Sequence, residues 1–533
     1  MENKATLESE MNGAGDTSVI AENTAADAAP GHRWLGFFAV LTALIMNLLD
    51  STVANVAAPS IRAELGASYS DVQWIAAGYA LALAVGLLTG GRLGDLFGRR
   101  RMLVIGVTGF TLASLACAFA PDPGALIAAR VVQGLFGAAM VPQCFGLIRD
   151  LFPPRELGKA FSALGPVIGL STIAGPIVAG ALIDANLFGS GWRAVFGINL
   201  PLAAFALVGA LKALPDKPAV GGRTMKLDGV GALLAGAAMF LLVYPLVQGR
   251  ELGWPAWTGL EFAGAAVLFA LFGLHQAWRS RRGAATLVEF SVLTKRSYAG
   301  GVLFTLIFFG AIVGFALVIG LLLQLGLGYT PVRASLTMAA WAVGAFFGSG
   351  FGATMMYRLG RRILHLGLAI MAVSLVGLYL VFAHDGAGLV GWHLMPALGV
   401  YGFGMGMIFV PLFDIIMGEV GDREVGSASA ILESLQQLGA SVGVAALGTV
   451  FFGTIGPRPR LASFVQAGEH VTLIAIALIA AAFVLGFLLP RRARRQEFAA
   501  EQEAEQAAEQ AAAQAAEQAA EQAAITEREP VAV

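Results

Sequence analysis

The sequence predicts an all-α polytopic membrane protein, and three observations lead to that fold class. Hydrophobic residues make up 57% of the 533-residue chain and charged residues only 13%, whereas about a quarter of a typical soluble chain is charged. Apolar runs of about 20 residues, long enough to cross a bilayer, follow one another along most of the chain. Between the second and third runs stands a Gly- and Arg-rich hairpin, GRLGDLFGRRRM (91–102).

Fourteen apolar stretches are expected to cross the membrane as helices, because backbone polar groups find no water in lipid and no strand-like alternation is visible. In chain order they are 35–57, 71–91, 103–120, 124–147, 160–183, 195–214, 229–247, 259–277, 299–324, 334–356, 363–383, 392–417, 427–454 and 470–490. Each boundary carries an error of about two to four residues. The polar N-terminal residues lack the basic region of a cleavable signal, so we expect the first span to be retained.

Lys and Arg residues orient these spans. With both termini inside, the inner segments and their edges hold 27 Lys and Arg residues, and the outer loops hold six. This excess follows the positive-inside rule, and an odd number of spans would scramble it. We therefore expect an inner (cytoplasmic) membrane protein with both termini in the cytoplasm.

A second sequence resembles the Arg-rich hairpin, which indicates an internal repeat. YRLGRR (357–362), between spans 10 and 11, shares the Gly-Arg-Arg ending of LFGRR (96–100). If spans 7 and 8 are an insertion, both hairpins fall between the second and third spans of a six-span half. Two such halves form a transporter architecture with a site near the midplane. The expected domains are a polar cytoplasmic N-tail (1–34), an N-terminal six-helix half (35–214), two inserted helices (229–277), a C-terminal six-helix half (299–490) and a cytoplasmic Ala/Glu/Gln-rich tail (491–533).

Five motifs carry a resemblance to a known family. They are the 91–102 hairpin, LDSTVANVAAP (49–59) in span 1, LIAARVVQGLFGAA (126–139) in span 4, AGPIVAG (174–180) in span 5 and GWRAVFGINLP (191–201) at the start of span 6. Over roughly residues 35–490 the chain resembles the major facilitator superfamily and, within it, the fourteen-span drug:proton antiporters. The resemblance implies the major facilitator fold, with two six-helix halves plus two inserted helices. It also implies a secondary active exporter of amphipathic, cationic drugs or natural products, driven by inward proton flow.

Asp50 and Arg130 are the residues that we expect to couple transport to protons. Each is an ionisable side chain inside a span, where it costs at least a few kcal/mol. Asp50 lies about 15 residues into span 1 and Arg130 about six residues into span 4 from the opposite side, so both lie at a similar depth. An Asp that is alternately desolvated and paired changes its proton affinity. The alternatives are a permanent lock of Asp50 to Arg130 or to the backbone and, for Arg130, fixed helix bridging.

A second group of residues is expected to form a conformational gate. Asp95 stands at the inner end of span 2 beside Arg99 and Arg100, with which it can pair, and the resemblance implies that this hairpin latches one conformation. The other expected gate residues are Gly91, Gly98, Gly175, Pro176 and Gly180. Small residues let helices approach closely, so ordinary packing is the alternative for those of span 5.

Other polar residues within spans are candidates for the substrate cavity. They are Gln133, Gln324, Asp414, Glu433 and Gln437. Asp414 and Glu433 are expected near the inner ends of spans 12 and 13, where each either faces a cationic substrate or reaches out to water. The amides either line the cavity or bond across helices.

Several functions are excluded or disfavoured by what the sequence lacks. No phosphate-binding Gly loop ending in Lys-Ser/Thr is present, so ATP is not the expected energy source. No catalytic or metal-binding cluster is apparent, and we expect no enzyme activity, cofactor or metal. The expected partners are a small-molecule substrate, protons and the bilayer, and not nucleic acid, with the oligomeric state open. The alternative function is a proton-coupled or facilitative carrier of a small metabolite.

Overall fold

The computed structural model describes residues 30–152, 171, 174–216, 227–284, 286–288, 296–417, 425–456 and 459–489. The regular secondary structure of these residues is helical, with no strand, which confirms the all-α expectation for them. Among them, 13 helices are long and apolar enough to cross a membrane. A shorter helix, Ala174–Ala185, covers the second part of the predicted fifth span. The first part of that span, the polar N-terminal residues 1–29 and the Ala/Glu/Gln-rich tail lie outside the described residues.

The helices form two halves and an inserted pair. The first half contains α2 (Pro30–Leu65), α3 (Tyr69–Phe97), α4 (Arg99–Ala118), α5 (Pro123–Leu151), helix Ala174–Ala185, η1 (Leu187–Gly189), α7 (Arg193–Gly197) and α8 (Asn199–Ala213). The inserted hairpin consists of α9 (Gly229–Gln248) and α10 (Trp257–Arg281). The second half contains α12 (Arg296–Leu321), η3 (Leu322–Gly326), α13 (Pro331–Leu359), α14 (Arg362–Asp385), η4 (Gly386–Gly388), α15 (Gly391–Ile416), α16 (Val425–Ile455), α17 (Leu461–Leu485) and η6 (Gly486–Leu488).

Capping side chains begin several helices at the end of the bundle away from Pro30 and Leu485. We call this the distal end and the other the proximal end. Ser68 and Asp71 form a reciprocal capping box at the start of α3. Thr330 caps α13 by accepting a hydrogen bond from the Arg333 amide, and proline follows it at the first helical position. These caps satisfy N–H groups that have no partner within the helix.

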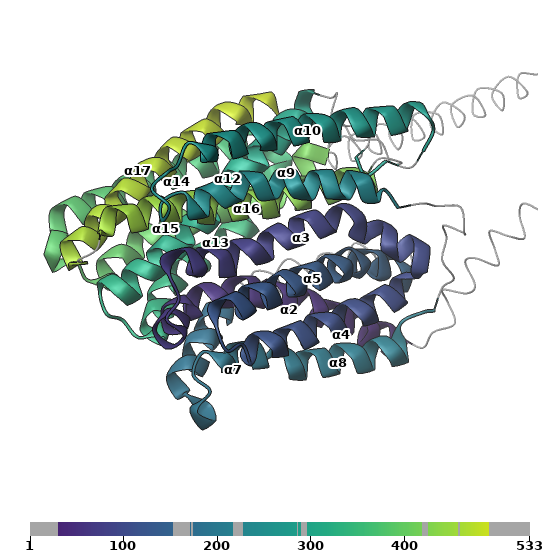
Figure 1. Cartoon of the computed structure of the whole chain (residues 1–533), viewed down its shortest axis with the longest axis horizontal. Coiled ribbons are helices and arrows are strands. Elements are labelled where there is room, and N and C mark those ends of the chain that lie inside the picture. Colours follow the sequence, from purple (N-terminus) through teal and green to yellow (C-terminus); the bar gives the residue numbers. More distant parts are fainter. Residues whose placement is uncertain are drawn as a thin grey trace, which may run out of the picture.

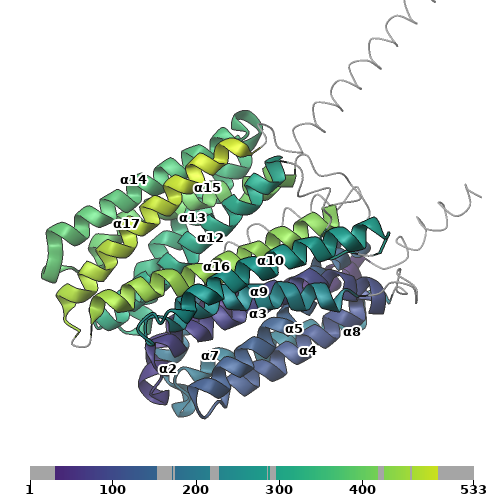
Figure 2. The same cartoon turned by 45° about the horizontal axis from the view of Figure 1, so that its top comes forward.

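The two halves meet along α3 and α16. Within the first half α3 packs on α5 and α2 packs on α8, while in the second half α12 packs on α16 and α13 on α15. Helix α9 contacts α10, α3 and α16, so the inserted hairpin lies along the junction between the halves. Figure 2 shows α9 and α10 running alongside α3 and α16.

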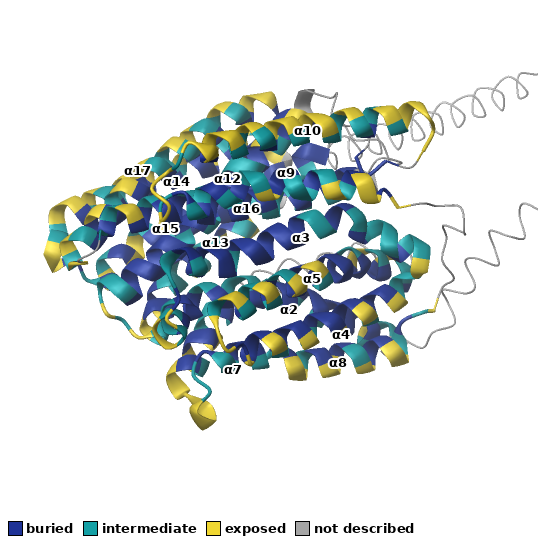
Figure 3. Cartoon of the chain, viewed as in Figure 1, coloured by how far each residue is buried: buried dark blue, intermediate teal, exposed yellow. Residues whose placement is uncertain are grey.

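Burial follows this arrangement. Figure 3 shows exposed positions on the outer faces of α10 and α8 and buried positions along α3. The large apolar core of the second half continues into α3 through Trp74 and Leu81 and into α9 through Met239 and Val243. Helix α3 therefore contributes to the cores of both halves.

The halves repeat one close helix contact. Tyr79 and Trp341 are each the eleventh residue of their helices, α3 and α13. A Cβ at Gly134 of α5 would lie 2.6 Å from the Tyr79 carbonyl oxygen, and one at Gly402 of α15 would lie 1.9 Å from that of Trp341. Glycine is therefore required at the same place in both halves. Both Arg-rich hairpins also turn at a glycine with a positive φ, Gly98 (φ 90°) and Gly360 (φ 51°).

The described contacts close the distal end between the halves. Gln324 Nε2 donates to the Val56 carbonyl at 3.2 Å, and the Val332 amide donates to Asp184 at 3.3 Å. At Gly180 a Cβ would lie 2.8 Å from the Pro331 carbonyl oxygen. These contacts join α2 to η3, and helix Ala174–Ala185 to α13.

Candidate functional site

Asp50 and Arg130, which the sequence placed at a similar depth, form a buried ion pair. Asp50 of α2 is 3% exposed and Arg130 of α5 is 0% exposed. Arg130 Nη1 donates to Asp50 Oδ2, and Arg130 Nε donates to the Ile75 carbonyl of α3 at 3.2 Å. The pair therefore joins three helices. Removing one partner of such a pair costs about 3–5 kcal/mol, because the other charge stays buried and uncompensated.

Two amide side chains complete the coordination of the carboxylate. Gln133 Nε2 donates to Asp50 Oδ1 at 2.8 Å, and Asn199 Nδ2 of α8 donates to the same oxygen at 3.1 Å. Gln133 also accepts a hydrogen bond from Arg130 Nη1 at 2.8 Å. Both carboxylate oxygens thus accept hydrogen bonds from side chains of the network. Gln133 belongs to this network, although the sequence suggested it for the substrate cavity.

A second layer of polar groups supports the ion pair. The Arg130 guanidinium lies 4.0 Å from the ring centre of Tyr79, whose hydroxyl donates to Asn47 Oδ1 at 2.7 Å. Asn199 also donates to Ser114 Oγ at 2.8 Å. These residues were not among the predicted site residues. Asp50 was selected as an ionisable side chain within a span, whereas the wider criterion that selected Gln133 and Gln324, a polar side chain within a span, would also have found Asn47 and Asn199.

This arrangement restricts what the carboxyl group can do. A proton and the Arg130 guanidinium compete for the same Asp50 oxygen atoms. If Asp50 is protonated in place, Arg130 keeps its charge in a buried site without its partner, which is costly. Loss of the charge on Asp50 would therefore destabilise Arg130 in its present position.

The Arg-rich hairpin contacts its own half. Arg99 Nη2 lies 3.5 Å from Asp95 Oδ1, and Arg99 Nη1 lies 3.3 Å from Asp150 Oδ2 of α5. Arg100 Nη2 donates to the Leu211 carbonyl of α8 at 2.8 Å. The hairpin thus fastens α3 and α4 to their neighbours. At Gly91 a Cβ would lie 4.0 Å from Pro142 Cβ, an ordinary contact distance.

The expected gate residues of span 5 lie between the halves. Gly175 faces α2, where a Cβ would lie 2.8 Å from Thr52 Oγ1. Gly180, on the same short helix beyond Pro176, faces the start of α13. This helix therefore packs on the first half with one part and on the second half with another.

The remaining candidates for the substrate cavity lie in different places. Gln324 is 9% exposed and bonds to α2 near the distal end. Glu433 and Gln437 are half-buried, one turn apart on α16, and Asp414 is half-buried on α15. Of these four residues, Gln324 therefore contributes to the distal closure.

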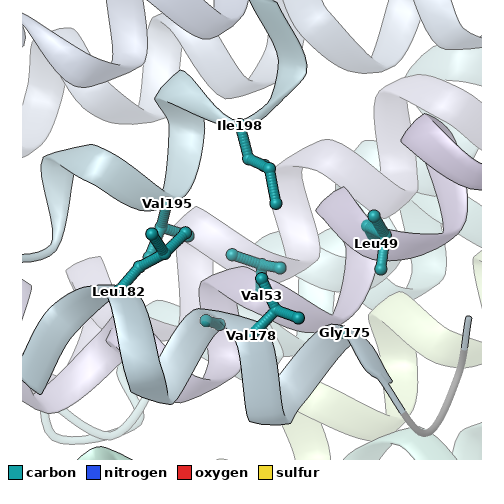
Figure 4. Close-up of a pocket in the computed structure, with 8 residues that line it drawn as sticks. Leu49, Val53, Gly175, Val178, Leu182, Val195 and Ile198 are labelled. Carbon is teal, nitrogen blue, oxygen red and sulfur yellow. The ribbon is translucent and has the colours of Figure 1, made fainter. Parts of the chain in front are cut away.

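A small apolar cavity of about 10 Å³ lies beside α2. Leu49 and Val53, on either side of Asp50 in the chain, line it together with Gly175, Val178 and Ile198 (Figure 4). Pockets for drug-sized molecules are usually about 300–1,000 Å³. This cavity is therefore far too small to hold such a substrate in the present conformation.

Comparison with known proteins identifies relatives of this chain. The family model described as Major Facilitator Superfamily matches residues 40–444. A probable actinorhodin transporter of Streptomyces coelicolor is 49% identical over 82% of this chain and 76% of its own length. A tetracenomycin C resistance and export protein of Streptomyces glaucescens is 34% identical over 81% of this chain and 79% of its own length.

Solved structures share the fold. A bacterial homologue of the human lysosomal transporter Spinster, in an inward-facing and occupied conformation, aligns with a TM-score of 0.60 and 15% identity, covering 86% of this chain and 97% of the other. At that identity the likeness concerns the fold alone.

Proposed function

Because this chain belongs to the major facilitator superfamily and is an efflux transporter of its drug-exporting branch, we propose that it exports amphipathic, cationic drugs or natural products in exchange for protons. Its relatives bear the names of natural-product exporters and resistance proteins. Proton exchange supplies the energy, and Asp50 with Arg130 couples the proton to the change of conformation.

The observation that carries this proposal is the buried Asp50 carboxylate, which receives donors from three side chains. With the distal end closed, Asp50 is paired with Arg130. This corresponds to the state after a proton has been released toward the proximal side. When the distal side opens, a proton displaces Arg130 from the carboxylate, and the pair forms again after the protein returns. Burial links each proton to one such rearrangement.

An acidic residue on α16 supports the cationic character of the substrate. Glu433 is half-buried in the span that meets α3, and the next residue, Ser434, donates to the Ala84 carbonyl of α3 at 2.6 Å. An ionisable residue in a span usually faces the bundle interior and marks a substrate or ion pathway. We assign Glu433, with Gln437 one turn away, to the substrate path, and Asp414 to its second-half wall.

The direction of export depends on membrane orientation. We propose that the proximal end faces the cytoplasm, so that both termini are cytoplasmic and the protein lies in the inner membrane. Lys and Arg are enriched in the segments at that end. The distal closure then separates the site from the outside.

The test is proton flux in everted vesicles acidified inside and followed with a pH-sensitive dye. Tetraphenylphosphonium serves as the cationic probe and triphenylphosphine oxide as its uncharged counterpart. We expect the cation to collapse the gradient with wild type and with Asp122→Asn, an exposed Asp that caps α5. Asp50→Asn should abolish this flux, because its side chain takes up no proton in the working pH range.

Binding of the same probe separates loss of coupling from misfolding. Asp50→Asn should still bind tetraphenylphosphonium in a thermal-shift assay. If the wild type carries the probe without moving protons, and Asp50→Asn behaves identically, the chain is a facilitative carrier and the coupling proposal is wrong.

A further inference from the structure

The inserted hairpin touches both halves at the distal end. We propose that it is a moving part of the distal gate: Glu251 and the Val247 carbonyl latch it to Ser70 of α3, and the hairpin separates from α3 with α16 when the gate opens. The proposal rests on the proposed function in one respect only: the direction of export decides what opening of the distal gate does in the transport cycle. The contacts that support it are independent of the Asp50 network.

Ser70 forms the latch to the first half. It is 1% exposed, and its backbone amide donates to Glu251 Oε1 at 3.1 Å. Its hydroxyl donates to the Val247 carbonyl at 3.1 Å. Val247 belongs to the last turn of α9, and Glu251 to the loop that follows. The end of the inserted hairpin is therefore held at the first turn of α3 by two polar contacts.

Tyr69, next to the latch, holds the two halves together. Its ring stacks on Phe452 of α16 with 4.3 Å between the ring centres. The Arg62 guanidinium lies 4.2 Å from the Tyr69 ring centre, and that of Arg250 lies 5.6 Å from it. Arg250 comes from the hairpin loop, and its Nη2 lies 3.6 Å from Glu251 Oε1. First half, second half and inserted hairpin thus meet at one aromatic ring.

The hairpin is bound to α16 as well. Thr449 Oγ1 of α16 donates to the Leu246 carbonyl of α9 at 2.5 Å. At the proximal end, Leu287 and Val288, which follow α10, form an apolar cluster with Ile431 of α16. The hairpin therefore contacts α16 near both of its ends, whereas its polar contacts with α3 lie at Ser70.

A buried polar cluster keeps the proximal end of the hairpin together. Asp228, which is 1% exposed, caps α9 at the Gly231 amide and accepts a hydrogen bond from Gln276 Nε2 of α10 at 2.6 Å. Burial alone would raise the pKa of Asp228, but hydrogen bonds from His275, Gly231 and Gln276 and the charge of Arg279 hold that pKa below its usual range. Asp228 therefore stays ionised and keeps α9 and α10 together.

The same cluster fixes the chain that leads to α16. Gln276 Oε1 accepts a hydrogen bond from the Leu287 amide at 2.8 Å. The polar cluster thus extends directly into the apolar contact of Leu287 and Val288 with Ile431. The side-by-side contacts of α9 with α3 beyond Ser70 include apolar pairs such as Trp74 with Phe240, whose ring centres lie 6.0 Å apart. Apolar surfaces separate without leaving an unpaired charge, so the hairpin can part from α3 once the polar contacts at Ser70 are broken.

The first test measures conformation and not transport. Ala445→Cys is the reporter, because Ala445 is fully buried on α16 and its carbonyl accepts from Gln73 of α3. Labelling by a maleimide in lipid nanodiscs reports separation of α16 from α3, and the parent chain gives the blank because its two cysteines are buried. Glu251→Ala should raise the labelling rate about threefold to tenfold.

Glu64→Ala is the matched control. Glu64 also pairs with an arginine at the distal end, but its partner Arg193 belongs to the same half. Its removal should leave the labelling rate within about twofold of the parent. Equal labelling in Glu251→Ala and Glu64→Ala would overturn the latch.

Two cross-links test which way the hairpin moves. A short bifunctional thiosulfonate joins Ser70→Cys to Val247→Cys in one variant and Leu246→Cys to Thr449→Cys in the other. The first cross-link should stop tetraphenylphosphonium transport until it is reduced, and the second should leave transport at the level of the uncross-linked variant. A block by the second cross-link, or by neither, would overturn the proposal. The labelling experiment does not depend on whether protons drive transport. Failure of the proposed function can therefore be told apart from failure of the latch proposal.

Discussion

The same helical frame holds an ionic network in the first half and an aromatic cluster in the second. Helices α2, α3 and α5 bring together Asp50, Tyr79 and Arg130. At the corresponding place, α12, α13 and α15 bring together Phe315, Trp341 and Tyr401, with 4.7 Å between the ring centres of Trp341 and Tyr401 and 5.4 Å between those of Phe315 and Tyr401. Tyr79 and Trp341 occupy the same position of their helices.

The comparison shows that the two halves share a helix arrangement but place different side chains around it. The glycine contacts that set the helix distance are shared, at Gly134 and Gly402. The side chains around them are not: charge is balanced by charge on one side, and rings pack on rings on the other. One hydroxyl marks the difference, since the described residues provide no hydrogen-bond partner for the buried Tyr401 Oη, whereas Tyr79 Oη has Asn47.

The largest expected effect comes from breaking the ionic network on one side only. Arg130→Ala should lower the free energy of unfolding by about 3–5 kcal/mol, because Asp50 then stays buried without a counter-charge. The double variant Asp50→Asn/Arg130→Gln should lose much less than the sum of the single changes, since both charges are gone. Thermal unfolding in detergent measures both, and simple additivity would show that the pair is not coupled.

A smaller effect should appear at the shared glycines. Gly402→Ala and Gly134→Ala should each cost about 1–3 kcal/mol, because the added methyl group meets a backbone carbonyl that cannot move cheaply. Gly402→Ala should cost more than Gly134→Ala. The Cβ at position 402 would lie 1.9 Å from the Trp341 carbonyl oxygen, whereas the Cβ at position 134 would lie 2.6 Å from the Tyr79 carbonyl oxygen. The same unfolding assay checks the order, and a harmless Gly402→Ala would contradict the shared frame.

The smallest effect separates the two hydroxyl groups. Tyr79→Phe should cost about 1 kcal/mol, because it leaves the Asn47 oxygen without its donor. Tyr401→Phe should be neutral or slightly stabilising, because it removes a buried hydroxyl that has no partner among the described residues. A loss for Tyr401→Phe equal to that for Tyr79→Phe would mean that the Tyr401 hydroxyl group is satisfied.

Properties that act along the chain could be predicted from the sequence. Apolar runs mark the spans because each helix has to satisfy its own backbone in lipid, and depth along a span follows from the rise per residue, which is why the proximity of Asp50 and Arg130 was predictable. The Gly-Arg-Arg echo at 98–100 and 360–362 likewise predicted the repeated hairpin.

Contacts that depend on the rotation and pairing of helices could not be predicted. Asn199 reaches Asp50 only because α8 packs on α2, and nothing in a single sequence states that pairing. Gln324 illustrates the same limit, since its position in a span suggested the cavity while its amide bonds to the Val56 carbonyl. The meeting of Ser70 with Glu251, 181 residues apart, has no local signal at all.

The shared core of α3 has a consequence for biosynthesis. Trp74 and Leu81 belong to the apolar core of the second half. While the ribosome is still making the first half, this face of α3 therefore lacks its partners from the second half. Helix α9 comes next in the chain after α8 and packs on α3. Helix α9 is therefore made before α16, and it can cover part of this face of α3 while the rest of the face still waits for α16.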